Sequence, residues 1–395
     1  MLTPSGYGVL VVGVAASVLG WGWGYREGVV LGVACLLAVV TALAWTTRRP
    51  SIQARREVVP GKVARGDSAQ GRVSLTNNGG RALRGLRAED HVARIAVPPV
   101  YLPTVGPGAE IRARYDLPTH RRGRVEIGPM DLVRGDPLGL TRRARQYGGL
   151  ETLIVRPRTI ALNALPAGRT HHLEGPTSDT ADEGTLTFHS LREYVMGDDL
   201  RRVHWKSTAR TGTMMVRRLK DVSLPQTTLV LDTNPAAYGD GLDADERGQA
   251  FEVAVDIVAS IASSVTRNNF PLTVLTGGGT MPGVLGEHRR QEHWLDLLAE
   301  VWPQADHSLA DAFDAVERQR GGDALIVVTG GTDTLGLQRL DRVQSGFDRA
   351  LLVRVAPVPT RGAPTGTGAG ATVVPHLRVS NLEEFAVAWR KEISR

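Results

Sequence analysis

The chain has 395 residues, of which 42% are hydrophobic and 22% are charged, and its formal net charge is +6. This length accommodates two folded domains and further segments, and the hydrophobic share excludes an intrinsically disordered chain. The single cysteine, Cys35, excludes an intrachain disulfide and gives no sign of an oxidising compartment. The arginines are spread over many segments without interleaved aromatic residues, which does not favour a nucleic-acid-binding protein.

Residues 1–50 contain two uncharged segments, Gly6–Gly24 and Gly28–Thr47, which are separated by Arg26 and Glu27. Each has about the 20 residues that an α-helix needs to cross a bilayer. The short connection predicts an antiparallel transmembrane helical hairpin. A cleaved signal peptide is the alternative for the first segment, but that segment lacks a basic start and the second span follows at once.

Aromatic and basic residues predict the direction of this hairpin. Its tip carries Trp21, Trp23 and Tyr25, whose rings favour the headgroup layer. Four arginines follow the second segment: Arg48, Arg49, Arg55 and Arg56. Because positive charge is retained in the cytoplasm, both termini and the soluble domains are predicted to be cytoplasmic. The Arg48–Arg56 cluster is predicted to contact anionic membrane lipid.

Residues 51–165 predict an antiparallel β-sandwich of the immunoglobulin-like kind. Short alternating segments such as Gly71–Leu75 and Ile111–Leu117 are separated by turn-forming residues such as Asn77-Asn78-Gly79-Gly80. The region contains no catalytic motif. Its predicted role is that of a spacer and interaction module.

Residues 166–222 combine a polar linker, His171–Thr185, with the densely charged and aromatic segment Leu191–Arg217, LREYVMGDDLRRVHWKSTARTGTMMVR. We refer to Leu191–Arg217 as the signature segment. Asp198 or Asp199 is predicted to cap a short helix that runs through Arg210 and stops at Gly212, and Met214–Leu219 is predicted to be a strand. The histidines around it, His171, His172, His189 and His204, follow no zinc-site spacing.

The candidate site residues of the signature segment are charged, aromatic or helix-terminal: Arg192, Glu193, Tyr194, Gly197, Asp198, Asp199, Arg201, His204, Trp205, Thr208 and Arg210. The main interpretation is structural, with Tyr194 and Trp205 packed between the two soluble domains. Truncating Trp205 to alanine would then cost about 3–5 kcal/mol. The alternatives are an exposed docking surface, or acid–base chemistry by Asp198, Asp199 and His204.

Residues 223–395 predict a doubly wound α/β domain. Its apolar strand segments begin at Thr227, Pro271, Asp323 and Ala350. Its helical segments are Glu246–Arg267, Arg290–Val301, Leu309–Arg320 and Leu382–Ile393. The Gly- and Pro-rich run Pro357–Pro375 is predicted to be a loop, because no Lys-Ser/Thr pair follows its glycines as in a phosphate-binding loop.

The signature segment, and the block His120–Arg145 with its turn Asp136-Pro-Leu-Gly139, resemble the two recognisable blocks of the family called domain of unknown function 58. The resemblance covers nearly the whole chain. It implies a bacterial membrane-anchored protein with a von Willebrand A-like domain, and it implies an association with MoxR-type AAA+ ATPases. It implies no defined reaction.

A von Willebrand A domain can bind a divalent ion through an Asp-x-Ser-x-Ser loop, since hard cations prefer oxygen ligands. The matching positions here are Asp232, Asn234 and Ala236, and glycines follow the later strand at Gly330 and Gly331. These departures predict no bound metal and no cofactor, although Asp240, Asp243 and Asp245 remain as replacement carboxylates. The chain also lacks a Walker A loop, a Gly-x-Ser-x-Gly elbow and a His-Glu-x-x-His pair.

The sequence therefore favours a non-enzymatic, membrane-anchored cytoplasmic scaffold or adaptor that works with a MoxR-like ATPase in the assembly or maturation of a protein complex. The first alternative is a metal-dependent ligand-binding von Willebrand A module. The second is a hydrolase centred on the signature segment.

Overall fold

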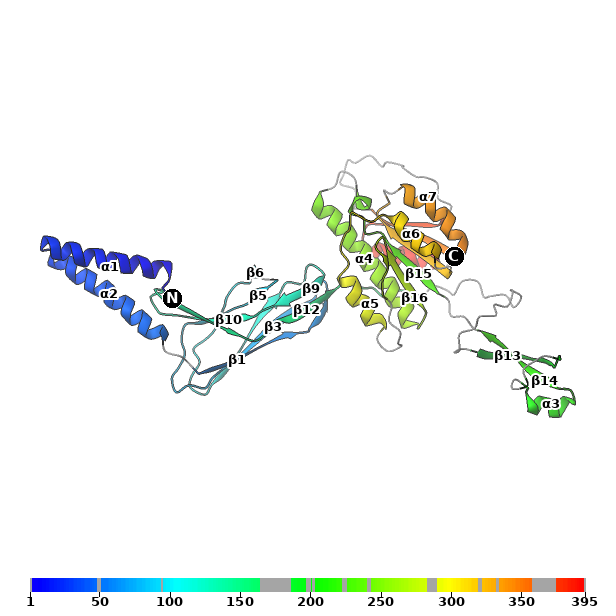
Figure 1. Cartoon of the computed structure of the whole chain (residues 1–395), viewed down its shortest axis with the longest axis horizontal. Helices are drawn as coiled ribbons and strands as arrows, with labels where there is room; N and C mark the ends of the chain where they lie inside the picture. Colours follow the sequence, from blue (N-terminus) through cyan, green and yellow to red (C-terminus); the bar gives the residue numbers. More distant parts are fainter. Residues whose placement is uncertain are drawn as a thin grey trace. The chain divides into compact units, whose positions relative to one another are not determined.

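The computed structural model describes residues 2–47, 51–93, 95–163, 186–196, 200, 203–221, 226–239, 243–282, 290–318, 322–331, 334–356 and 374–393. The chain divides into two compact units, which Figure 1 shows in sequence colours. The first comprises residues 1–158 and 295–301, and the second comprises residues 159–294 and 302–395.

The first unit begins with two antiparallel helices, α1 (Pro4–Trp23) and α2 (Arg26–Thr47). Both are long and apolar enough to cross a membrane. The Thr3 hydroxyl caps α1 by accepting the Gly6 N–H, and Gly24 ends it with a φ of 73°. The helices meet through small residues: a Cβ added at Gly32 would lie 2.1 Å from the Ser17 hydroxyl oxygen. Such small side chains allow close backbone approach between membrane helices.

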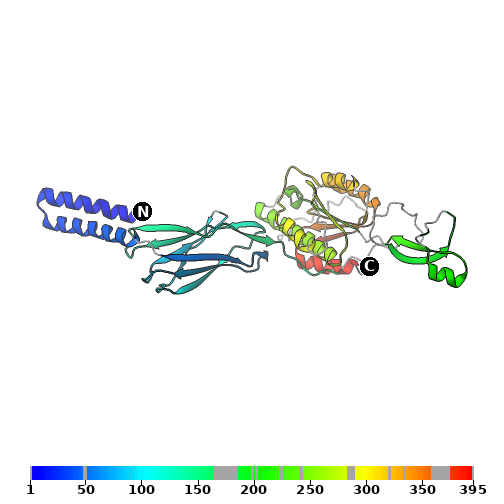
Figure 2. The same cartoon turned by 60° about the horizontal axis from the view of Figure 1, so that its bottom comes forward.

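The remainder of the first unit is rich in β-structure, and its strands are visible in Figure 2. They form three sheets with the orders β1-β3-β8, β11-β10-β4-β7 and β2-β12-β9-β5-β6, in which only β2–β12 is parallel. The strands are β1 (Ile52–Val59), β2 (Lys62–Ala64), β3 (Ala69–Asn77), β4 (Leu86–Glu89), β5 (His91–Val92), β6 (Ile95–Ala96), β7 (Val100–Tyr101), β8 (Glu110–Leu117), β9 (Gly123–Ile127), β10 (Met130–Gly135), β11 (Arg142–Tyr147) and β12 (Glu151–Arg156).

The alternating sequence of β3 explains how the core of this unit forms. Val73 and Leu75 are buried on one face of the strand, and the residues between them are less buried. The next residues form the predicted turn, where the buried Asn77 side chain accepts the Gly79 N–H and donates to the Val105 carbonyl. This amide therefore links the turn after β3 to the loop backbone around Val105.

The predicted contact between Arg56 and lipid is wrong. The Arg56 side chain is buried, and its Nη2 donates to the carbonyls of Ile127, at 3.1 Å, and Gly149, at 2.6 Å. Its Nε lies 3.7 Å from the Asp90 carboxylate, to which the Tyr115 hydroxyl also donates. Burial, followed by the hydrogen bond to Asp90, raises the pKa of Tyr115. Arg56 faces inward because it alternates with the exposed Arg55 along β1.

Arg48 and Arg49, the other members of the predicted lipid-binding cluster, lie outside the described residues. Among the described residues of this cluster, Arg55 is exposed and Arg56 is buried.

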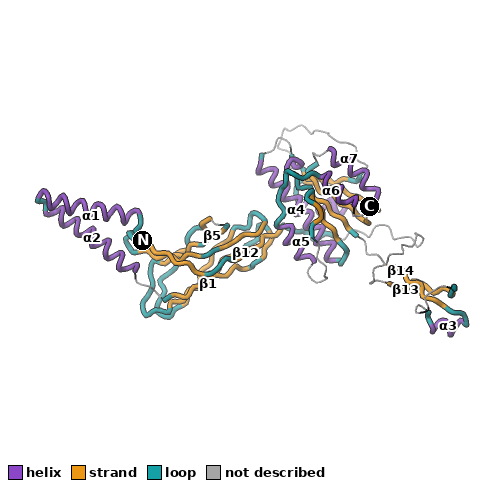
Figure 3. The backbone as a smooth tube through the Cα atoms, in the orientation of Figure 1, coloured by secondary structure: helices purple, strands orange, loops and turns teal. Residues whose placement is uncertain are grey.

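The second unit contains a six-stranded sheet with the order β17-β16-β15-β18-β19-β20, in which only β17 is antiparallel to its neighbour. Figure 3 shows its helices in purple beside its strands in orange. The strands are β15 (Thr227–Leu231), β16 (Leu272–Thr276), β17 (Gly279–Thr280), β18 (Gly322–Thr329), β19 (Phe347–Val355) and β20 (His376–Val379). The helices are η2 (Pro235–Tyr238), α4 (Ala244–Arg267), α5 (Arg290–Ala299), α6 (Leu309–Arg318), α7 (Thr334–Val343), η3 (Gln344–Gly346) and α8 (Leu382–Ile393).

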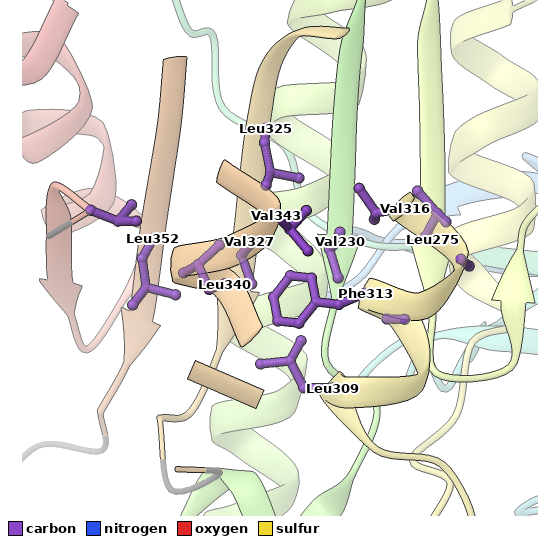
Figure 4. Close-up of a cluster of buried hydrophobic side chains, with 13 residues drawn as sticks. Val230, Leu275, Leu309, Phe313, Val316, Leu325, Val327, Leu340, Val343 and Leu352 are labelled. Carbon is purple, nitrogen blue, oxygen red and sulfur yellow. The ribbon is translucent and has the colours of Figure 1, made fainter. Parts of the chain in front are cut away.

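One core of this unit lies between the sheet and the helices α6 and α7. Figure 4 shows Phe313 of α6 among Val230 of β15, Val327 of β18 and Leu340 of α7. The α6 side chains alternate between buried and exposed with a helical period, which explains why α6 was predictable. Helix α7 was not predicted, although Leu337, Leu340 and Val343 recur at helical spacing in its sequence TLGLQRLDRV.

The helix α4 is the third helix that is long and apolar enough to cross a membrane, but most of it is buried within the second unit. Part of its covering comes from residues 159–163. The Ser260 hydroxyl accepts the Ile160 N–H at 3.1 Å, and the Ser264 hydroxyl donates to the Leu162 carbonyl at 3.2 Å. The helix is thus apolar because it is central to the α/β unit.

Candidate functional site

The signature segment forms a β-hairpin that carries a short helix (Figure 1). Strands β13 (Leu186–Glu193) and β14 (Met215–Asp221) pair in antiparallel register, with Glu193 opposite Met215. The Tyr194 N–H donates to the Met214 carbonyl and the His204 N–H donates to the Met215 carbonyl, both at 2.8 Å. Tyr194 and His204 are therefore both hydrogen-bonded at the start of β14, to the consecutive residues Met214 and Met215.

The helix α3 (Trp205–Thr211) begins later than predicted. Its cap is His204, whose Nδ1 accepts the Ser207 N–H at 3.2 Å, so the predicted cap at Asp198 or Asp199 is wrong. Asp198 and Asp199 lie outside the described residues, and in the sequence they come seven and six residues before the first helical residue, whereas the cap is the residue directly before it. The predicted stop is confirmed: Gly212 has a φ of 79° and donates its N–H to the Thr208 carbonyl.

Thr208 fastens α3 to β14. Its hydroxyl donates to the His204 carbonyl at 3.1 Å and accepts the Met215 N–H at 3.0 Å. The cap at His204, the bond at Thr208 and the stop at Gly212 hold α3 in one geometry on the hairpin.

The exposed apolar residues of the signature segment contradict the packing predicted for Trp205. Trp205 is 66% exposed and Met196 is 95% exposed, and α3 buries none of its residues. Val195 and Leu200 are also exposed, while Tyr194 is half-buried. The charged Arg192, Glu193 and Arg210 are exposed. The remaining candidates, Gly197, Asp198, Asp199 and Arg201, lie outside the described residues.

A second candidate site lies where β15 and β18 end at the carboxyl edge of the parallel sheet, the usual ligand-binding edge of such sheets. The buried Asp232 carboxylate accepts the Thr329 hydroxyl at 2.7 Å with Oδ2 and the Asn234 N–H at 3.0 Å with Oδ1. The Asn234 side-chain oxygen in turn accepts the Ala236 N–H at 3.0 Å. The side-chain oxygens of Asp232 and Asn234, two of the predicted metal-site positions, thus accept hydrogen bonds from the backbone of their own loop.

The helix η2 covers this edge. A Cβ added at Gly330 would lie 2.1 Å from the Ala237 carbonyl oxygen, so the glycine is required by the close approach of η2. The Tyr238 hydroxyl donates to the Asp232 carbonyl at 2.6 Å. Sequence reasoning missed Thr329 and Tyr238. A threonine at the end of the strand that pairs with β15 was the available signal.

The replacement carboxylates do not join Asp232. Asp243 caps α4 by accepting the Glu246 N–H at 2.7 Å, Asp245 lies in the first turn of α4, and Asp240 is outside the described residues. Within the described ranges, no three His, Cys, Asp or Glu side chains form a group that could hold a metal ion.

Comparisons with solved structures give only weak similarities. The CARDB domain of a Pyrococcus furiosus protein is 14% identical, with 27% of this chain and 91% of that chain covered and a TM-score of 0.21. Red sea bream transglutaminase is 19% identical, with 28% and 15% covered and a TM-score of 0.21. The alkylpurine DNA glycosylase AlkC of Pseudomonas fluorescens is 12% identical, with 33% and 40% covered and a TM-score of 0.21. These scores support no inference about fold or function.

No curated protein matches the chain. Residues 190–358 match a family model, and this range includes the whole signature segment, the Asp232 loop and strands β15 to β19. These residues of the chain match the family described as protein of unknown function DUF58.

Proposed function

We propose that this protein is a non-enzymatic, membrane-anchored scaffold or adaptor, and that its signature segment docks a MoxR-type AAA+ ATPase during the assembly or maturation of a protein complex. In this proposal the β-rich part of the first unit is an immunoglobulin-like spacer, and the second unit is a von Willebrand A-like domain. The ATPase partner comes from the family resemblance, and the docking surface comes from the exposure of the signature segment.

The observation that carries the proposal is the exposure of Trp205 and Met196 on a hydrogen-bonded support. A tryptophan at the first position of a capped helix has a fixed backbone, so binding would order little more than its ring. Tryptophan and arginine are enriched among the residues that dominate binding energy, and Arg210 lies exposed on the same helix. The exposed apolar side chains of this segment therefore suit a protein partner.

The geometry at Asp232 favours the scaffold over the metal-dependent alternative. Each oxygen of the Asp232 carboxylate already accepts one hydrogen bond, from the Asn234 N–H and from the Thr329 hydroxyl, which reduces the lone pairs left for an ion. The neighbouring Ala236 offers no side-chain oxygen. Because a divalent hard cation needs six or more oxygen ligands, this set is a poor site.

The proposed orientation places both termini in the cytoplasm. Trp21, Trp23 and Tyr25 are exposed at the connection between α1 and α2, as expected for rings in the outer headgroup layer. The docking surface would then be available to a cytoplasmic ATPase.

The proposal is tested by capture of the cognate MoxR-type ATPase on the full chain in detergent. We expect Trp205→Ala to weaken the complex by about 30-fold or more, the factor that corresponds to the loss of a hot-spot residue of about 2 kcal/mol. The melting temperature should stay near that of the wild type, because substitutions at exposed positions change stability by roughly 0.5 kcal/mol or less.

The matched control is Trp302→Ala, which removes a tryptophan that is 52% exposed outside the signature segment. It should leave ATPase capture unchanged. Equal capture by the wild type and the Trp205 variant would refute the docking role, and a large loss of stability in that variant would restore the packing interpretation.

A further inference from the structure

The turn between β10 and β11 is tied to the ends of both apolar helices. The Thr3 N–H donates to the Leu140 carbonyl at 2.9 Å, and the Thr3 hydroxyl donates to the Gly139 carbonyl at 2.7 Å. On the other side, the Thr141 hydroxyl lies 3.1 Å from the Ala42 carbonyl oxygen of α2. The turn is therefore fixed beside the start of α1 and the last turns of α2.

These contacts fix the level of the turn relative to a membrane that the helices cross. Ala42 is five residues before the end of α2, or about 7.5 Å along the axis at 1.5 Å per residue. Trp45 follows it in the last turn, and tryptophan favours the boundary between hydrocarbon and headgroups. A turn that touches Ala42 and the first residues of α1 lies at this boundary or slightly inside it.

The tip of the turn presents an apolar side chain at this level. Leu138 is 66% exposed, while its neighbour Leu140 is buried against Val39 and Ala42 of α2. The tip is also rigid, because the Asp136 carboxylate accepts the N–H groups of Leu138 and Thr141 at 2.9 and 2.5 Å.

Arginines flank the turn on the side of the last turn of α2. Arg134 of β10 and Arg143 of β11 are directly opposed in register, so their like charges share one face of the sheet. The Arg134 guanidinium lies 6.0 Å from the centre of the Trp45 ring, and Arg143 donates to the Thr47 carbonyl at 3.2 Å. These contacts place the guanidinium groups of Arg134 and Arg143 beside the last turn of α2, where anionic headgroups would lie.

We propose that the β10–β11 turn rests in the headgroup layer of the membrane that α1 and α2 cross, with Leu138 against lipid and with Arg134 and Arg143 on the phosphates of acidic phospholipids. The inference rests on the proposed membrane anchoring and is independent of the ATPase. It gives the first unit a second attachment to the bilayer beyond the two helices.

The test uses the full chain with Cys35→Ala, which leaves no other cysteine, reconstituted in nanodiscs that contain phosphatidylcholine and about 30% phosphatidylglycerol. Leu138→Cys carries an environment-sensitive fluorophore. We expect this probe to be shielded from iodide and quenched by a nitroxide on a lipid headgroup. The matched control is Leu150→Cys, since Leu150 is also a leucine, is 65% exposed and follows the far end of β11.

The six residues of β11 put about 20 Å between the two probes. The Leu150 probe should therefore be open to iodide and distant from the headgroup quencher. Equal iodide quenching at both positions in chains that have entered the nanodiscs would overturn the inference and leave the anchoring intact. A chain that does not enter the nanodiscs would overturn both.

The lipid charge is tested with the same probe at Leu138. Replacing phosphatidylglycerol by phosphatidylcholine should lower the fraction of probe that is shielded from iodide. Arg143→Gln should lower the ratio of shielded to accessible probe by about fivefold, the factor that corresponds to roughly 1 kcal/mol per basic residue at an anionic surface. Arg121→Gln removes an exposed arginine between β8 and β9 and should have no effect. Equal shielding in both lipid mixtures would overturn the assignment of acidic lipid.

Discussion

Substitution by valine is expected to have opposite effects on stability at Thr329 and at Thr233, which both lie at the carboxyl edge of the parallel sheet. Both side chains are buried beside Asp232, but only the Thr329 hydroxyl is used: it donates to the Asp232 carboxylate at 2.7 Å and accepts the Gly331 N–H at 3.1 Å. The Thr233 hydroxyl is buried with no hydrogen-bond partner within the described part of the chain. Valine at either position keeps the shape and removes the hydroxyl.

The expected costs follow from these contacts. Thr329→Val removes a hydrogen bond to a buried charge, worth about 1.5–3 kcal/mol, and leaves an N–H without its acceptor, at about 1 kcal/mol. We expect a total loss of about 3 kcal/mol in the stability of the α/β unit. Thr233→Val should be neutral or should stabilise the unit by about 1 kcal/mol, because it removes a buried polar group without a partner.

Hydrogen exchange of the β18 amides in the full chain measures this difference at the sheet itself, which avoids a two-state treatment of a multidomain protein. A loss of about 3 kcal/mol corresponds to roughly 150-fold faster exchange. In Thr233→Val the β18 amides should exchange at the wild-type rate or more slowly. The reasoning is refuted if Thr329→Val exchanges within about threefold of the wild type, or if the two variants are equally affected.

Three further outcomes are expected. Calorimetry of the chain with magnesium or manganese should show no binding at micromolar concentration, and binding that disappears in Asp232→Ala would show a site that the loop forms only with the ion present. A reporter that is active only outside the cytoplasm should be silent when fused after Arg395, and strong activity would reverse the orientation. Burial raises the pKa of Asp136, but the hydrogen bonds that its carboxylate accepts from the N–H and hydroxyl of Thr141 lower the pKa by more, so the net shift is downward. The stability from this carboxylate should therefore be complete above pH about 4 and be lost as the pH falls through the lower folded-state pKa. Exchange of the Thr141 amide, corrected for its intrinsic rate, should show this loss as the pH falls below about 4 in the wild type, and a pH-independent protection in the wild type would contradict it.

The sequence alone determined the elements whose pattern is long and uninterrupted. Two runs of about 20 uncharged residues predicted α1 and α2, and the apolar segment at Thr227–Leu231 predicted a strand buried on both faces. The stop of α3 was also predictable, because glycine adopts a positive φ without strain. The four-residue strand β20 was missed because so short a segment gives a weak periodic signal. Helix α7 was also missed, although the spacing of Leu337, Leu340 and Val343 was an available signal.

The tertiary structure decided which polar groups are available for function. Arg56 belongs to a basic stretch in the sequence, yet the pairing of β1 turns it into the core. The Asp232 carboxylate accepts a hydrogen bond from Thr329, which is 97 residues away in the sequence. Thr141 likewise donates to the carbonyl of Ala42, which is 99 residues away. Trp205 is exposed on a short helix carried by a two-stranded hairpin, and an isolated two-stranded hairpin has little surface with which to cover such a ring. Such outcomes depend on pairing between distant segments, which local pattern does not encode.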